Sequence, residues 1–326
     1  MDSVSQFLLG AAVSTAVMGH KAPVWQAVLV GGVAGTLPDL DVLIDHGDAL
    51  RNMTLHRAAS HSLLYLSLLA PLLAWPLHRA QPAGAGYRRW WLAVWLALIT
   101  HPLLDLMTVY GTQLALPFTV RPWAIGSMFI IDPLYTLPLL LGTVMALWRR
   151  GDRGRWWNAL GLSLSTLYIL WSVAAQGWVT ERAEASLTRQ GIRWERLLVT
   201  PTALNTLVWR VVALDGDSYR EGYFSLLSPE RPLATRRWPR DAALAAQLRQ
   251  HPDVQRLASF SQGFWQVKAV NDEAWLMDLR MGEAPDYTFT FNLGPPNRTE
   301  SGTPVQRVPV ARPGLAAIGQ RFWQRL

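Results

Sequence analysis

The sequence predicts a helical, multi-pass membrane domain of about four to six spanning helices, followed by a small α+β domain with an antiparallel sheet. Half of the 326 residues are hydrophobic. Long apolar runs fill the chain before residue 180, whereas the sequence after it is mixed and charged, like that of a soluble domain. We therefore expect a membrane domain over residues 1–179 and an α+β domain over residues 180–326.

Composition excludes several classes of function. The net charge of +7 comes from scattered arginines that flank apolar segments, so it fits control of membrane topology and not a nucleic-acid partner. The chain has no cysteine, which excludes disulfides and thiolate metal sites. Its start lacks the basic region and cleavage site of a removable signal peptide, so we expect the first apolar stretch to remain.

Four segments approach or reach the length of about 17–25 apolar residues that a spanning helix needs. They are residues 62–77, 90–109, 128–148 and 156–178. Two earlier segments, residues 4–18 and 24–37, are shorter and rich in small residues. Gly31 and Gly35 stand four apart, a spacing that lets helices approach closely. The segments at residues 4–18 and 24–37 are expected to form two short spans or a re-entrant hairpin. The alternative is that they are two buried helices of a soluble protein.

Loop charge predicts the orientation. The loops after the third and fifth segments carry most of the basic residues near the membrane, which are Arg79, Arg88, Arg89, Arg149, Arg150, Arg153 and Arg155. The positive-inside rule makes their side cytoplasmic. Residues 38–61, residues 111–127 and the whole domain after residue 179 then face the extracytoplasmic side.

Ionisable residues beside membrane spans are energetically costly and usually functional. In this chain they all fall on the predicted outer side: Asp39, Asp41, Asp45, His46, His56, Arg57, His61, His101, Asp105 and Asp132. Each motif has a structural alternative, such as a helix stop, a solvated loop or a capped histidine. Their coincidence at one membrane face favours a metal site.

Local patterns predict how the side chains point. Pro38 should end the preceding helix, leaving Asp39 and Asp41 on one side of an extended stretch. Ser60 is expected to cap the third segment, with His61 at its first position and His56 in the loop before it. His101 and Asp105 stand four apart and so share a helix face, and Pro102 between them should kink that helix.

The candidate metal ligands are three imidazoles and three carboxylates: Asp39, Asp41, His56, His61, His101 and Asp105. A nitrogen and oxygen set suits zinc, manganese, iron or nickel and argues against calcium. We expect a divalent metal, with zinc or manganese favoured. Six ligands suffice for two ions, although one ion with carboxylates behind its ligands is simpler. His20, His78 and His251 are expected to be non-ligands, and His46 is left open.

Three motifs in this order between apolar helices carry a family resemblance. LPDLD at residues 37–41, HRAASHS at 56–62 and THPLLDLMTVYG at 100–111 resemble the bacterial membrane-bound, metal-dependent hydrolases typified by YbcI and YdjM. The resemblance covers about residues 1–180. It implies a multi-pass protein of the bacterial inner membrane with a hydrolase site at the six candidate ligands, and Thr108, Tyr110 and Gly111 extend the last motif.

Metal-assisted hydrolysis is therefore the leading functional hypothesis. A metal lowers the pKa of bound water from about 15.7 toward 7. Asp105 or Asp132 would act as general base, and Arg57, with Arg121 as a second candidate, would stabilise negative charge on a phosphoester. A site at the lipid boundary suggests a lipid or lipid-linked substrate. The alternatives are a metal or proton transporter and a non-catalytic regulatory protein stabilised by metal.

The domain after residue 179 has strand-like alternation at residues 206–213, 222–227, 264–269, 274–280 and 287–292, and a capped helix at 241–256. It contains no evident catalytic motif. Covering the site, recruiting substrate and adding stability are the roles open to it.

Overall fold

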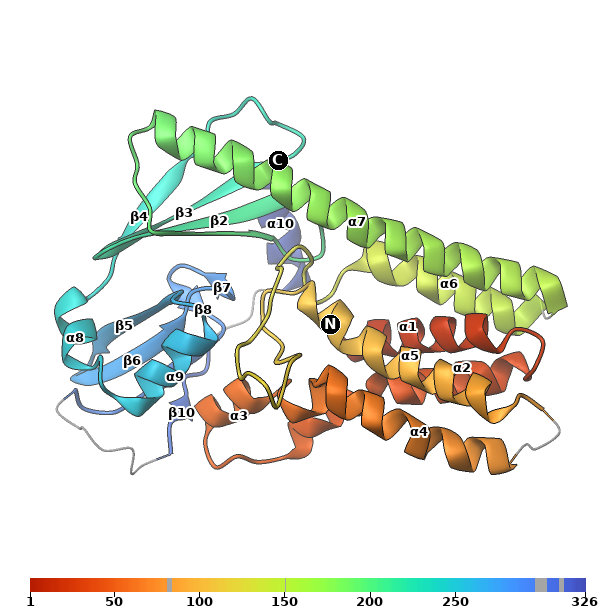
Figure 1. Ribbon diagram of the computed structural model, residues 1–326. Coiled ribbons are helices and arrows are strands. Elements are labelled where there is room, and N and C mark those ends of the chain that lie inside the picture. The colour runs from red at the N-terminus through yellow and green to blue at the C-terminus, as the bar shows by residue number, and fades with distance from the viewer. Residues whose placement is uncertain (81–83, 150, 297–303, 311–313) are drawn as a thin grey trace. The chain divides into compact units, whose positions relative to one another are not determined.

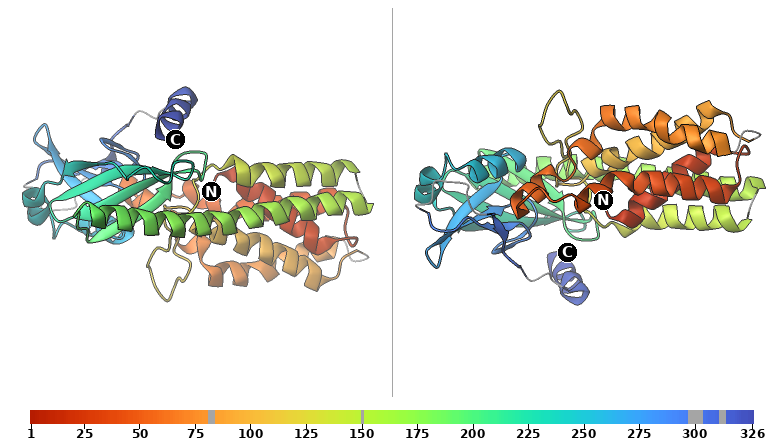
Figure 2. Two further views of the ribbon diagram at one scale, coloured as in Figure 1. Left: turned by 90° about the horizontal axis from the view of Figure 1, so that it is seen from above. Right: turned by 90° about the horizontal axis from the view of Figure 1, so that it is seen from below.

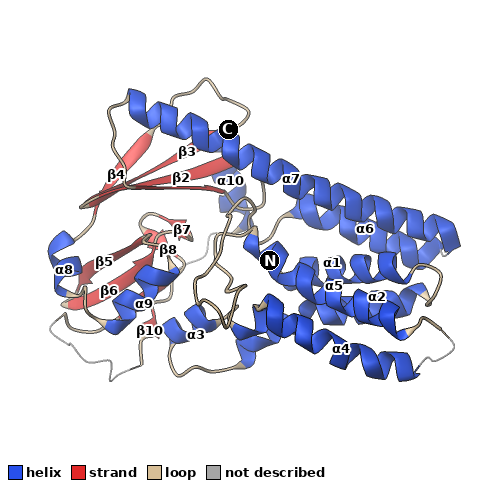
Figure 3. Cartoon of the chain, in the orientation of Figure 1, coloured by secondary structure: helices blue, strands red, loops and turns tan. Residues whose placement is uncertain are grey.

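The computed structural model (Figure 1) describes all residues except 81–83, 150, 297–303 and 311–313. The chain divides into two compact units. The first comprises Met1–Leu43 and Arg57–Val173, and the second comprises Ile44–His56 and Ala174–Leu326. Figure 3 shows that the first unit is helical and that the named strands belong to the second.

The first unit is a bundle of helices that alternate in direction. The helices are α1 (Ser3–Met18), α2 (Val24–Thr36), α4 (Leu63–Ala80), α5 (Tyr87–Leu106), α6 (Pro133–Arg149) and the first part of α7 (Gly151–Arg189). The C-terminal ends of α1, α4 and α6 lie at one end of the bundle, and those of α2 and α5 lie at the other (Figures 1 and 2). Short 3₁₀ turns, η1 (Leu37–Leu43) and η2 (Ala59–His61), follow α2 and precede α4.

Small residues bring α1 and α2 together, as their spacing predicts. A Cβ atom added at Gly31 would lie 2.2 Å from the carbonyl oxygen of Gly10, so only glycine permits this approach. In the same way, a Cβ atom at Gly161 of α7 would lie 2.3 Å from the carbonyl oxygen of Pro138 in α6. The predicted close helix approach is therefore confirmed.

Fewer helices than predicted are suited to span a bilayer. Within the described residues, three are long and apolar enough, namely Val24–Leu43, Leu63–Ala80 and Gly151–Arg189, and Ser3–Met18 is a shorter apolar helix. Helix α5 carries Arg88 and Arg89 at its start and two ionisable residues near its end. Helix α6 has 17 residues and begins at Pro133, not at residue 128, because the residue before a proline is disfavoured in a helix.

The second unit contains antiparallel sheets, as predicted. One four-stranded sheet has the order β1 (Arg196–Pro201), β2 (Val208–Asp215), β3 (Ser218–Ser225), β4 (Thr235–Pro239). The other has the order β10 (Gln306–Arg307), β9 (Thr290–Asn292), β6 (Glu273–Asp278), β5 (Trp265–Val270), and β7 (Gly282–Glu283) pairs with β8 (Asp286–Tyr287). The helices α3 (Ala49–Leu55), α8 (Ala242–Gln247), α9 (Pro252–Phe260) and α10 (Leu315–Arg325) complete the unit.

Two helix boundaries differ from the prediction. The helix expected at 241–256 is two helices, because Pro252 lacks the N–H that would continue the first and instead starts the second. Helix α7 does not stop near residue 178 but continues to Arg189. Its Val179, Ala183 and Leu187 recur every four residues and pack on Trp209 and Val211 of β2, which stabilises the extension.

Candidate metal centre

Four of the predicted ligands converge in the first unit: Asp39, His61, His101 and Asp105. Each offers one ligand atom, and these four atoms all lie within 4.8 Å of one another. His61, His101 and Asp105 are fully buried, whereas the Asp39 side chain is 19% exposed. Such a group of side chains can hold a metal ion.

The elements that carry these residues explain their convergence. Asp39 lies on η1 and His61 ends η2. His101 and Asp105 lie one turn apart on α5 and point into the same space, which confirms the prediction from their spacing. All three elements belong to the end of the bundle where α2 and α5 finish.

The distances suit a small cation. The two Nε2 atoms of His61 and His101 lie 3.0 Å apart. Asp39 Oδ1 lies 3.4 Å from each of them, and Asp105 Oδ2 lies 3.2 Å from His61 and 3.4 Å from His101. Four ligands at zinc-like bond lengths of about 2.0–2.2 Å in a tetrahedron stand roughly 3.3–3.6 Å apart. The side chains are thus almost correctly spaced for one ion.

Hydrogen bonds on the far side of each ring define which nitrogen carries the proton. His101 Nδ1 lies 2.6 Å from the carbonyl oxygen of Gly35, which can only accept, so Nδ1 carries the hydrogen. His61 Nδ1 lies 2.9 Å from Ser60 Oγ, and the Ser60 hydroxyl donates to Asp41 Oδ2 over 2.5 Å, so Ser60 Oγ accepts from His61. In the neutral rings both Nε2 lone pairs then face the shared space, as they do in metal-bound histidines.

Asp41 lies behind the cluster and is not one of the four. Its Oδ2 accepts from the Arg57 backbone N–H over 2.9 Å and lies 3.7 Å from His61 Nδ1. The stretch after Pro38 is a 3₁₀ turn and not the expected extended strand, and Leu37 keeps helical angles of φ −56° and ψ −41°. Because 3₁₀ residues two apart point in different directions, Asp39 and Asp41 contact opposite sides of the His61 ring.

Arg57 is buried beside the cluster. Its Nη2 lies 3.2 Å from Asp105 Oδ1, and its Nη1 donates to Thr108 Oγ1 over 3.3 Å. Its guanidinium lies 4.9 Å from the centre of the Tyr110 ring, and its backbone φ is 66°. Thr108 and Tyr110 of the third motif therefore hold the arginine against Asp105.

The sequence interpretation missed two contributors. Gln6 of α1 donates to Asp105 Oδ1 over 3.1 Å and to the His101 carbonyl over 3.2 Å, and the Met1 amino group also contacts Asp105. A glutamine in an apolar helix was the available signal. Ser60 does not cap the third segment, because α4 begins at Leu63; it orients His61 instead.

Other predicted residues lie elsewhere. Asp132 is buried at the start of α6, where it accepts from the Leu134 N–H over 3.1 Å and from the Tyr168 hydroxyl over 2.9 Å. His56 is the C-cap of α3 in the second unit, and Arg121 is exposed with its guanidinium 4.8 Å from the Trp123 ring centre. Among the described residues, His20, His46, His78 and His251 do not join the four-residue group.

A helical unit with apolar helices long enough to cross a membrane, and with buried side chains that can hold a metal ion, defines an integral membrane protein with a candidate metal centre. The chain belongs to the YdjM inner membrane protein family, whose family model matches residues 1–179. This confirms the family resemblance of the three motifs, and the matched region contains all four clustered residues.

The chain is similar to two curated relatives. It is 25% identical to the uncharacterized protein YfhP of Bacillus subtilis (strain 168) over 179 residues, which are 52% of this chain and 51% of that protein. It is 35% identical to the inner membrane protein YbcI of Escherichia coli (strain K12) over 113 residues, 34% of this chain and 62% of that protein. The chain thus spans less than two thirds of the length of either relative. No solved structure matches it.

Proposed function

We propose that this protein is a membrane-embedded, divalent-metal-dependent hydrolase that cleaves an ester or phosphoester of a lipid or lipid-linked substrate. One observation carries the proposal: two histidine Nε2 atoms and two carboxylate oxygens lie within 4.8 Å of one another. Such an arrangement is stable with a cation at its centre.

One zinc ion fits the ligand set best, with manganese as the alternative. Two nitrogens with two oxygens suit both metals, and a zinc ion held by four protein atoms could take the water as a fifth ligand. A second ion would need further ligands, and Asp41 is committed to Ser60 and to the Arg57 backbone. When bound, the metal would make a coordinated water acidic and polarise the scissile bond.

Arg57 gives the site a preference for anions. A divalent cation neutralises the two carboxylates of the cluster, and the buried guanidinium next to Asp105 leaves a net positive charge. Such a charge would stabilise the negative charge that develops on a phosphoester. It also makes Asp105 a poor general base, because Oδ2 faces the histidines and Oδ1 is held by Arg57.

Asp39 is the better candidate for the base, because a carboxylate that binds the metal through Oδ1 would keep its second oxygen to accept a proton. It is the most exposed of the four ligands, so water and substrate would approach from its side. Asp132 is engaged by Tyr168 and the start of α6, which supports a capping role over the catalytic one predicted from sequence. Leu40, Val42 and Leu43 on the same 3₁₀ turn are exposed, and this apolar surface beside Asp39 supports a lipid substrate.

Interfacial residues at the opposite end of the bundle support the predicted orientation. Near the C-terminal ends of α4 and α6, the Arg79 guanidinium lies 5.2 Å from the Trp75 ring centre and the Arg149 guanidinium lies 4.5 Å from that of Trp148. Tryptophan and arginine together favour a cytoplasmic membrane interface. We therefore place the metal centre, and the residues after α7, on the extracytoplasmic side.

A substrate panel tests the proposal. The purified protein in detergent should release product from at least one phospholipid or phosphoester when zinc or manganese is present, and a chelator should stop the reaction. His101→Ala should abolish turnover while the protein stays folded, and His20→Ala, an exposed histidine on the turn after α1, should keep full activity.

Each contrary result has a defined meaning. Full activity in His101→Ala would contradict the hydrolase proposal. Tight metal binding with no turnover on any substrate would favour the regulatory alternative. Metal flux into proteoliposomes would favour transport.

A further inference from the structure

A small hollow in the second unit, between α7 and the segment that follows β3, is lined by arginines. Its volume is about 180 Å³, and its lining includes Arg182, Ser186 and Arg189 of α7 together with Glu230 and Arg231. The α7 residues stand four and three apart and therefore share one helix face.

Hydrogen bonds fix the two walls relative to each other. The Leu233 N–H donates to Ser186 Oγ over 3.2 Å, and Gln190 Nε2 donates to the same oxygen over 3.1 Å. Ser186 Oγ thus accepts twice, and its own hydrogen has no acceptor among the described residues. Because Ser186 lines the hollow and is only 5% exposed, this buried O–H is available to a ligand there.

The arginines of the hollow have no carboxylate partner. Within the described ranges, none of the three guanidinium groups forms a salt bridge, although Glu230 also lines the hollow. Arg182 lies over the Trp178 ring at 5.1 Å, and Arg189 Nε donates to the Ala185 carbonyl over 3.3 Å. Three positive charges against one negative charge around a small space call for an anion.

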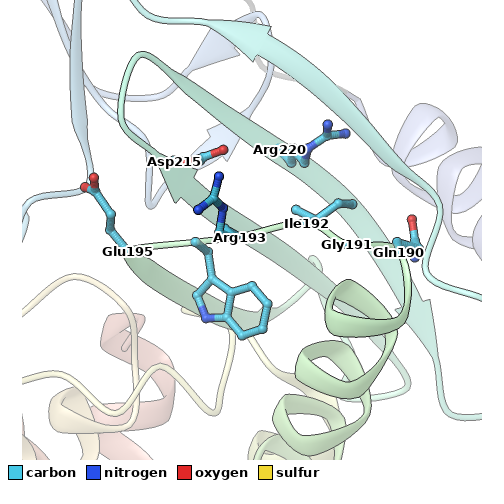
Figure 4. Close-up of a pocket in the computed structure, with 8 residues that line it drawn as sticks. Gln190, Gly191, Ile192, Arg193, Glu195, Asp215 and Arg220 are labelled. Atoms are coloured by element: carbon cyan, nitrogen blue, oxygen red, sulfur yellow. The ribbon is translucent and has the colours of Figure 1, made fainter.

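A second hollow in the same unit provides the contrast. It is larger, about 530 Å³, and Figure 4 shows Arg193 and Arg220 near Asp215 and Glu195 at its edge. Two carboxylates match two guanidinium groups there, so it has no net preference for anions. The smaller hollow differs in its uncompensated positive charge.

We propose that the smaller hollow binds a phosphoryl anion, held by Arg182, Arg189 and Arg231 and by the hydroxyl of Ser186. The planar guanidinium fork matches phosphate oxygens, and the hydroxyl supplies a further donor. At roughly 30 Å³ per water, the volume equals that of about six waters, enough for one phosphoryl group and a few further atoms. The group comes either from free phosphate or from a lipid headgroup. This inference is independent of the hydrolase proposal.

Calorimetric titration of the full-length protein in a non-ionic detergent tests this site. The probes are inorganic phosphate and the water-soluble lipid dihexanoyl phosphatidylglycerol. The double variant Arg182→Gln/Arg231→Gln should weaken binding of the preferred probe at least about tenfold, and Ser186→Ala should weaken it about three- to tenfold. The matched control Arg249→Gln/Arg256→Gln removes two charges outside the hollow and should bind like wild type. Thermal unfolding verifies that each variant is folded. If the double glutamine variant does not fold, the double variant Arg182→Lys/Arg231→Lys replaces it in the titration.

The possible results distinguish a free-phosphate ligand from a lipid headgroup, and both from a hollow that binds neither. Saturable phosphate binding that depends on the hollow supports a free-phosphate ligand, and binding of the lipid alone with the same dependence supports a headgroup. Equal loss in the control pair, equal binding in all variants, or no saturable binding of either probe would overturn the proposal. None of these results depends on turnover at the metal centre.

Discussion

At the scale of single residues, the metal centre is defined by the atoms behind the ligands. The Gly35 carbonyl and Ser60 hydroxyl take the Nδ1 hydrogens of His101 and His61, so both Nε2 lone pairs face the same space. Partners of this kind typically change metal affinity by about 10–100-fold when they are removed. The ligand spacing and the proton positions therefore both support a metal ion at the centre of the four side chains.

Ser60→Ala tests this arrangement. The variant loses the acceptor for His61 Nδ1 and the link from that ring to Asp41. We expect metal affinity, measured by competition with a chromophoric chelator, to fall by about 10–100-fold, and Ser60→Thr to retain most of it. Unchanged affinity in Ser60→Ala would show that Ser60 does not orient the histidine.

The spacing of residues in the sequence predicts which side chains come together in the cluster better than it predicts which residues contact those side chains from behind. The i, i+4 spacing of His101 and Asp105 sets their direction on α5, and this prediction is confirmed. The separate roles of Asp39 and Asp41 depend on a 3₁₀ turn that the residues around Pro38 do not specify. The contribution of Gln6 requires knowing that α1 packs on α5, which is a tertiary contact without a local pattern.

At the scale of elements, glycines determine how closely the helices around the site can pack. Helix α2 leads directly into the turn that carries Asp39, and its Gly31 faces Gly10 of α1. Any side chain at Gly31 must push the helices apart. The position of Asp39 thus depends on α1–α2 packing.

Gly31→Ala should destabilise the first unit by about 1–3 kcal/mol, because the added Cβ would overlap the Gly10 carbonyl oxygen. Metal affinity should fall with it. Gly177→Ala on α7 is the control, since a Cβ there meets no atom within 4 Å, and it should be neutral or slightly stabilising. Chemical unfolding in detergent measures both, and equal stability of the two variants would contradict the packing argument.

A buried ion pair between β2 and β3 contacts the segment from Leu279 to Tyr287 of the second unit. Glu221 of β3 accepts from Arg210 Nη2 over 2.9 Å and from the Tyr287 hydroxyl over 3.2 Å. Arg210 Nη1 in turn donates to the Leu279 carbonyl over 3.0 Å. Burial raises the pKa of Glu221, but Arg210 and the hydrogen bonds lower it further, so the net pKa lies below its ordinary value.

This lowered pKa predicts the direction of the pH dependence. The stability that Glu221 contributes is fully present above the pKa of the unfolded chain and is lost as the pH falls through the lower folded value. The unfolding temperature should therefore fall as the pH is lowered from about 5 toward 3, and the fall should be smaller in Glu221→Gln. Glu184→Gln, at an exposed glutamate of α7, should keep the wild-type slope. Identical slopes in all three proteins would contradict the prediction.

Element boundaries were predictable where a residue type sets them. The prolines that start α6 and α9 both mark boundaries in the sequence, although the predicted ranges ran through them. The extension of α7 to Arg189 has a visible four-residue apolar period at Val179, Ala183 and Leu187. Strands β1 and β4 lack clear alternation, because half or more of each strand is not buried.

At the scale of the whole molecule, the prediction concerns which side of the membrane each part of the chain faces. The chain belongs to an inner membrane protein family, and its natural lack of cysteine makes single-cysteine labelling straightforward. In intact cells, Gln250→Cys should react with an impermeant maleimide, because we place the residues after α7 outside. Arg153→Cys should react only after the cells are permeabilised. The reverse pattern would invert the proposed topology.

The central claim is that Asp39, His61, His101 and Asp105 share one metal ion. Elemental analysis of the protein purified without added chelator tests it most directly. We expect about one zinc or manganese per chain in the wild type and in His20→Ala, and nearly none in a His61→Ala/His101→Ala double variant that remains folded. Equal metal content in the double variant and the wild type, or none in either after reconstitution with excess metal, would contradict the account.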